Sequence, residues 1–258
     1  MAKQKSVKRV LIYFILGTIA ILSLYPLQRA MIEEQLKTIP VDPGMSVSAL
    51  TLLSMVNPLI FLILALTAGY FLAEKTGFYS IVVHSGNFRT EIKKGLLPAV
   101  IGGTVTGVLI ILFDFFMRPF LPDGLKLTIQ LPRVVMILPE LLYGGIFEEL
   151  MMRFGLMTFF TWLLWKIFLR KQKTPPDAVY ITAIIVTALL FALGHLPATS
   201  ILTEMTGPVW FRMIFLNGIG GIIFGWLYWK YSLESAMIAH MTAHIAKNLC
   251  MVILWVLF

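Results

Sequence analysis

The chain has 258 residues, of which 59% are hydrophobic and only 13% are charged, and its formal net charge is +8. This composition excludes an ordinary soluble domain, because the apolar runs are repeatedly long enough to cross a hydrocarbon core of about 30 Å. The positive charge does not indicate nucleic-acid binding, since much of it lies beside apolar runs and has no interleaved aromatic residues. We therefore expect a polytopic protein of the lipid bilayer, with no nucleic-acid partner, that forms a single membrane domain over residues 1–258.

Eight apolar segments follow one another along the chain. They lie near residues 10–26, 49–72, 96–116, 134–152, 154–168, 178–196, 208–229 and 234–257. Because backbone polar groups must be satisfied within a segment in lipid, and because the segments lack the alternation of barrel strands, we expect helices. The sequence predicts an all-α bundle of about eight transmembrane helices. The number is seven if 134–152 or 154–168 is short or re-entrant.

Basic residues beside the spans predict the orientation. The run from Val10 to about Tyr25 is interpreted as an uncleaved first span, since no small-residue cleavage pattern follows it. The positive-inside rule places the N-terminus and the basic interval 75–94 in the cytoplasm, and the compact chain with its basic start is typical of a prokaryotic cell membrane protein. Arg170, Lys171 and Lys173 would face outward if both 134–152 and 154–168 cross the membrane.

Pro139 and the pair Gly144-Gly145 precede the most polar part of the second half. They could break a helix beside a watery cavity, or they could allow helices to pack closely through small residues. Both interpretations remain open at this point. A second group of small residues is expected to pack helices rather than bind phosphate, and it consists of Gly218, Gly220, Gly221 and Gly225.

Ionisable residues within the apolar segments are candidates for function. Glu148, Glu149 and Arg153 would each cost roughly 2.5 to 3.5 kcal/mol at a bilayer centre unless paired or solvated. Three histidines in apolar context follow them, at His195, His240 and His244. The chemistry is therefore expected in the second half of the chain.

These residues form three short patterns in order: Glu148-Glu149-Leu-Met-Met-Arg153, Phe191-Ala-Leu-Gly-His195 and His240-Met-Thr-Ala-His244. Together they resemble the signature of the type II CAAX prenyl endopeptidase and bacteriocin-processing family (Abi, CPBP) of intramembrane glutamic proteases. The resemblance covers about residues 140–250, a protease-like core that carries the motifs. It implies an eight-helix membrane fold and peptide hydrolysis.

The resemblance also implies roles for individual residues. Glu148 and His195 would activate a water molecule, and His240 would steady the oxyanion of the tetrahedral intermediate. A carboxylate desolvated among apolar groups has a raised proton affinity, which suits Glu148 to act as general base. Glu149 and Arg153 are four residues apart, so on a helix they can form a supporting ion pair.

The third pattern departs from the family, which commonly has asparagine four residues after the histidine. Here His244 stands at that position. A neutral imidazole can donate one hydrogen bond and could substitute, or Asn248, one helical turn further, could supply the amide.

The spacing of His240 and His244 also resembles that of paired zinc ligands on one helical face. With His195 and Glu148 they could complete a tetrahedral metal site. The HExxH pattern is absent, because Met241 stands where its glutamate would be, so we expect no metal and no other cofactor.

The candidate residues must come from different depths of the membrane. His240 lies six residues into its span, roughly 9 Å, whereas Glu148 and His195 lie toward the opposite face. We therefore expect broken or tilted helices around a polar cavity in which the three side chains converge.

Two functions from different classes fit these observations. The first is an intramembrane endopeptidase that hydrolyses a peptide bond in a membrane-associated protein or peptide, more plausibly a secreted peptide than a prenylated protein. The alternative is a non-catalytic membrane scaffold or bacteriocin-immunity partner that retains the protease fold. A transporter would show internal symmetry between its halves, and the sequence shows none.

Overall fold

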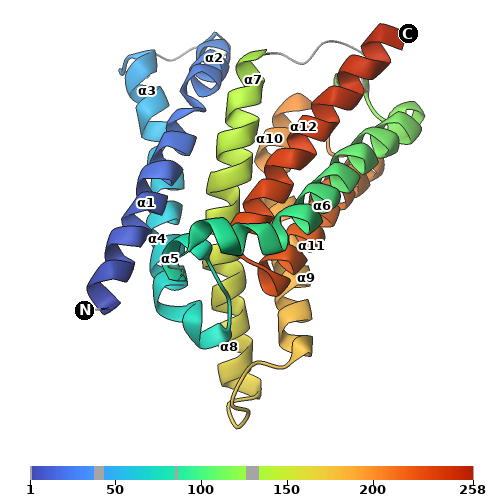
Figure 1. Ribbon diagram of the computed structural model, residues 1–258. Helices are drawn as coiled ribbons and strands as arrows, with labels where there is room; N and C mark the ends of the chain where they lie inside the picture. Colours follow the sequence, from blue (N-terminus) through green and yellow to red (C-terminus); the bar gives the residue numbers. More distant parts are fainter. Residues whose placement is uncertain (1, 38–43, 85–86, 126–133, 258) are drawn as a thin grey trace.

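A computed structural model describes residues 2–37, 44–84, 87–125 and 134–257, and all regular structure in these ranges is helical (Figure 1). The prediction of an all-α membrane bundle is confirmed. The elements of the first half are α1 (Ala2–Leu22), α2 (Tyr25–Leu36), α3 (Val47–Ser54), α4 (Val56–Leu72), η1 (Glu74–Thr76), α5 (Ile81–His84), α6 (Phe88–Met117), η2 (Arg118–Phe120) and η3 (Asp123–Leu125).

The second half carries the three sequence patterns. Its elements are α7 (Val134–Pro139), η4 (Glu140–Glu148), η5 (Leu150–Met157), α8 (Thr158–Phe168), α9 (Asp177–Gly194), α10 (Leu196–Leu202), α11 (Gly207–Lys230) and α12 (Leu233–Leu257). The elements η4 and η5 are π-helical, and the backbone remains helical through Glu149 between them.

Within the described ranges, six helices are long and apolar enough to cross a membrane, at Val7–Leu36, Val47–Leu72, Phe88–Phe120, Asp177–Leu202, Gly207–Lys230 and Leu233–Leu257. The segments expected near 134–152 and 154–168 are joined in one continuous helical run, 134–168, from α7 to α8 (Figure 1). This run adds one traverse, so the structure fits the alternative of seven. The two predicted segments are not separated at residue 153, where the Arg153 side chain is buried and ion-paired within the run.

The single traverse also resolves the conflict in orientation. After two spans, the connection between α4 and α6 lies on the same side as the N-terminus, and the run 134–168 returns the chain to that side. In Figure 1 the N-terminus and the connection from α8 to α9 both lie in the lower half of the view. The basic residues 170–173 therefore share one end of the bundle with the N-terminus.

Glycines bring the helices of the site close together. A Cβ atom at Gly103 or Gly107 of α6 would collide with backbone atoms of α12, so α12 can pack directly along α6. Likewise a Cβ atom at Gly221 of α11 would lie 2.7 Å from the Cβ atom of Ala188 in α9. The expectation that the glycines of α11 pack helices is borne out at this contact.

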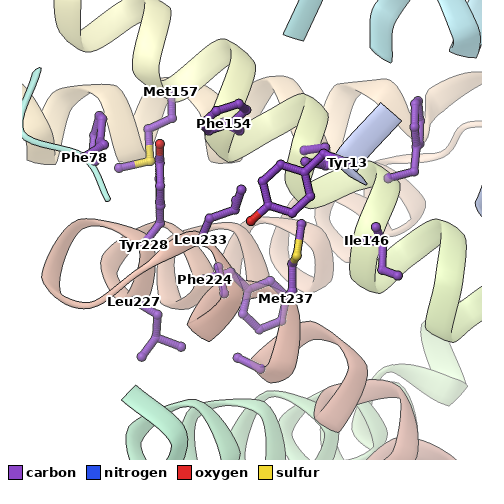
Figure 2. Packing of buried hydrophobic residues seen from close by; sticks show 14 of the residues in the cluster. Tyr13, Phe78, Ile146, Phe154, Met157, Phe224, Leu227, Tyr228, Leu233 and Met237 are labelled. Atoms are coloured by element: carbon purple, nitrogen blue, oxygen red, sulfur yellow. The ribbon is translucent and has the colours of Figure 1, made fainter. Parts of the chain in front are cut away.

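The apolar core lies between α1, the run 134–168, α11 and α12. Figure 2 shows its large side chains, among them Tyr13, Phe154, Phe224, Tyr228 and Met237. Each of these is less than a tenth exposed. The core therefore forms a dry layer across this part of the bundle.

A buried carboxylate, Glu234, joins distant parts of the chain beside this core. Its oxygens accept hydrogen bonds from the hydroxyls of Tyr13 (2.5 Å) and Ser80 (3.0 Å) and from the backbone N–H groups of Ile81 and Val82 (2.8 Å each). Four donors compensate for the removal of the carboxylate from water. Glu234 thus ties α1 and the start of α5 to the start of α12.

Candidate active site

A cavity of about 400 Å³ contains the candidate residues, and Glu148, His195, His240 and His244 all line it. Its wall is formed by the first part of the run 134–168, the end of α9, the middle turns of α6, α11 and α12, and the junction of α1 and α2. The Nε2 atom of His240 lies 3.8 Å from Oε2 of Glu148. Glu148, His195 and His240 converge in one cavity, as predicted, but most of the cavity wall is apolar.

The helix that carries Glu148 is not broken at Pro139 but changes to π-helix at Glu140. A Cβ atom at Gly144 would lie 2.7 Å from Nε2 of His244 and 3.4 Å from Nε2 of His240. The absence of a side chain at Gly144 therefore makes room for both rings. Of the two interpretations of this glycine pair, close packing is the correct one.

Glu149 points away from the cavity and links two partners. Its Oε2 atom accepts a hydrogen bond from Nε of Arg153 at 3.1 Å, and its Oε1 atom lies 2.9 Å from Nδ1 of His240. Glu149 and Arg153 have no exposed surface. The predicted Glu149 and Arg153 ion pair is confirmed, and the contact with His240 explains how the charges are tolerated in an apolar helix.

This contact determines the protonation of the His240 ring. A carboxylate only accepts hydrogen bonds, so Nδ1 of His240 carries the donated proton. In the neutral ring Nε2 then holds a lone pair, and it can donate a hydrogen bond only when the ring is an imidazolium.

His195 stands at the end of α9 and begins the turn into α10. Its Nδ1 atom lies 2.8 Å from the backbone carbonyl oxygen of Phe191 and therefore donates to it. Nε2 of the neutral ring is left as a hydrogen-bond acceptor. The Phe191 ring lies edge-on to both His195 (centroids 4.8 Å apart) and His240 (6.2 Å).

A second polar cluster lies further along the cavity. Glu140 accepts hydrogen bonds from Nζ of Lys247 (2.6 Å) and Nδ2 of Asn248 (2.8 Å), and Nδ1 of His244 is 3.7 Å from its Oε2 atom. The rings of His240 and His244 stack with centroids 5.0 Å apart. The amide group of Asn248 is thus engaged by Glu140, whereas His244 lies beside His240.

The metal alternative does not match this arrangement. In the part of the chain that the structure describes, no three side chains of His, Cys, Asp or Glu are grouped as ligands of a metal ion would be. The residues named for that site, Glu148, His195, His240 and His244, share the cavity without forming such a group. We derive no step through a metal.

The three sequence patterns identified Glu148, His195, His240 and His244, which all line the cavity. Two features of the site were not predicted. Glu149 appeared only as the partner of Arg153, because its contact with His240 joins residues 91 positions apart. Tyr143 was not singled out, although it lines the cavity next to Glu148 and packs against Phe147 with centroids 4.6 Å apart. Tyr143 comes beside Glu148 through the π-helical spacing of five residues, which no pattern in the sequence indicated.

Comparison with known proteins agrees with the motifs. Residues 130–246 match the model of a family described as Type II CAAX prenyl endopeptidase Rce1-like. No curated protein and no solved structure matches the chain. The matched segment contains all three sequence patterns and most of the cavity wall, so the similarity to this family lies in the part of the chain that forms the candidate site.

Proposed function

We propose that this protein is an intramembrane endopeptidase that hydrolyses a peptide bond in a membrane-associated protein or peptide. The observation that carries the proposal is the shared cavity, in which the carboxylate of Glu148 lies 3.8 Å from Nε2 of His240 and His195 lines the same wall. The family implies a protease of the CAAX type. The substrate and the roles of single residues belong to the proposal.

In the proposed reaction, Glu148 accepts a proton from a water molecule while the water oxygen attacks the scissile carbonyl carbon. Nε2 of His195 accepts the second hydrogen bond of that water and orients its lone pair. The resulting tetrahedral intermediate carries an oxyanion. The proton on Glu148 then passes to the leaving nitrogen as the C–N bond breaks, which returns Glu148 to its ionised form.

His240 is proposed to stabilise the oxyanion through Nε2–H. Because Nδ1 is committed to Glu149, this role requires the imidazolium form of His240. Glu149 is therefore a positioning residue that fixes the His240 ring, and Arg153 holds Glu149 in place. A preorganised donor of this kind in a water-poor site lowers the barrier by about 3 to 4 kcal/mol.

His244 is proposed to take the place of the asparagine common in the family. Its ring stacks on His240, and its Nε2 atom lies over Gly144, next to the cavity. A proton on Nε2 would give the oxyanion a second donor. Asn248 is not needed for this role, because its amide donates to Glu140.

A second candidate function is a non-catalytic scaffold or immunity partner. The observation that favours it is His244 at the position where the family commonly has asparagine. A scaffold needs the fold but not the base, so it should tolerate the replacement of Glu148 by glutamine, which keeps size and hydrogen bonding.

The test compares peptide cleavage by wild type, Glu148→Gln and His195→Ala in proteoliposomes, with and without a metal chelator. The matched control is Glu33→Gln, the same chemical change at an exposed carboxylate that pairs with Arg29. We expect cleavage by wild type and the control, none by the two site variants, and no effect of the chelator. Cleavage by Glu148→Gln at the wild-type rate would favour the scaffold, and loss with chelator would restore the metal alternative.

A further inference from the structure

The charged residues are distributed unevenly between the two ends of the bundle. The end that holds the N-terminus also holds residues 73–84, the connection at 169–176 and the turn between α11 and α12. The basic residues at this end include Lys8, Arg9, Lys75, Arg89, Lys93, Lys94, Lys166, Arg170, Lys171, Lys173 and Lys230. By the positive-inside rule this end is cytoplasmic.

The opposite end carries few basic residues. The described basic residues there include Arg29, Lys37 and Arg118. Two of these are already neutralised locally, since Arg29 pairs with Glu33 at 2.9 Å and Lys37 pairs with Glu34 at 2.6 Å. The excess of basic residues at the N-terminal end therefore gives the bundle a defined orientation.

The cavity extends toward the end with few basic residues. Leu24 and Leu27 at the junction of α1 and α2, and Met136 and Pro139 in α7, all line it. In Figure 1, α2 and α7 lie at the top, opposite the N-terminus. Glu148 lies at the inner part of the same wall, 12 residues after Met136.

The cytoplasmic side of the site is closed by packed side chains. The ring of Phe224 stacks on His240 with centroids 4.7 Å apart, and Tyr13, Tyr228 and Met237 continue the layer (Figure 2). None of these four core side chains is more than 7% exposed, so large packed side chains lie on this side of the site.

From these observations we infer that the catalytic cavity opens to the non-cytoplasmic face of the membrane. Its substrate is a peptide or membrane-protein segment that has already crossed the bilayer, or that enters from its outer side. The statement about the substrate rests on the proposed function. The orientation of the cavity is inferred from the distribution of charge and from packing alone. Export of the substrate must then precede its hydrolysis.

Thiol labelling tests the orientation without requiring activity. The single cysteine, Cys250, is first replaced in Cys250→Ala, and one cysteine is then introduced at a time. Met136→Cys and Leu27→Cys report the outer part of the cavity, and Lys173→Cys reports the basic end. Met237→Cys lies in the packed layer, where the native side chain is 7% exposed, and it serves as the buried control. A membrane-impermeant, charged thiol reagent is applied to right-side-out and to inverted membrane vesicles.

We expect Met136→Cys and Leu27→Cys to react in right-side-out vesicles and to lose that reaction in inverted ones. Lys173→Cys should show the reverse, and Met237→Cys should react in neither. The inference is overturned if the two cavity cysteines react only in inverted vesicles, if they react from neither side, or if Lys173→Cys reacts from outside.

Cleavage in the same oriented vesicles separates this inference from the proposed function. A library of membrane-proximal peptides added outside should be cut by right-side-out vesicles and not by inverted ones. Labelling as expected with no cleavage on either side would leave the orientation intact and refute the endopeptidase. Cleavage only in inverted vesicles would support the endopeptidase and refute the outward opening.

Discussion

Replacing Glu149 by glutamine should destabilise the protein strongly, although the change is nearly isosteric. Glu149 is the anionic partner of Arg153, and both side chains have no exposed surface. Among the described residues, Nη1 and Nη2 of Arg153 have no hydrogen-bond partner, so no other group compensates for the lost carboxylate. Glu149→Gln therefore leaves an uncompensated positive charge in the interior.

The size of the effect follows from the burial of the pair. Breaking a buried ion pair by removing one partner costs about 3 to 5 kcal/mol of unfolding free energy, whereas replacing both partners by groups of similar volume is often nearly neutral. The double variant Glu149→Gln with Arg153→Met should thus recover most of the stability. We expect a coupling free energy of about 2 to 3 kcal/mol between the two positions.

The assay is unfolding of the purified protein in mixed micelles with increasing denaturing detergent, followed by tryptophan fluorescence. Cleavage is measured in parallel, and it should stay low in the double variant because Nδ1 of His240 has lost its carboxylate partner. The reasoning is refuted if Glu149→Gln unfolds at the wild-type midpoint, or if the double variant is no more stable than the single one.

Two further substitutions test other contacts. Gly144→Ala places a methyl group 2.7 Å from Nε2 of His244. Turnover should therefore fall by about tenfold or more, which corresponds to about 1.4 kcal/mol. The control is Gly218→Ala, whose methyl group meets no atom within 4 Å, and it should cleave at the wild-type rate. Equal turnover of the two variants would show that the position of His244 is irrelevant to the reaction. Tyr13→Phe removes one of four donors to Glu234 and should lower the unfolding free energy by about 1.5 to 3 kcal/mol, and an unchanged thermal midpoint would contradict the role assigned to that network.

Local pattern was enough to predict most of the fold. Apolar length gave the spans, because a helix must satisfy its own backbone in lipid, and spacing alone paired Glu149 with Arg153. The division at residue 153 was wrong, because the charge of Arg153 is buried and paired inside one continuous helical run instead of marking the end of a segment.

Contacts between distant parts of the chain could not be predicted in this way. The motifs predicted that Glu148, His195 and His240 share one cavity. No local pattern indicates that Glu149 contacts His240, or that Glu140 contacts Asn248. Glu234, at the start of a span, was not singled out, because its four donors come from segments more than 150 residues away. Such partners depend on how the helices pack, which a single sequence does not state.

The π-helical stretch from Glu140 to Met157 makes the site sensitive to chain length as well as to residue type. A turn closed by a hydrogen bond to the fifth residue holds one residue more than an α turn. Removing a single residue between Glu140 and Glu148 would let one turn relax to α geometry without breaking the helix. If that turn keeps its π geometry instead, every later side chain is rotated by one position, and the carboxylate that now faces the cavity turns away from it. A deletion that leaves the span intact would in this way remove the proposed base from the cavity. A related protein with a shorter stretch would need another arrangement to hold its base in the cavity.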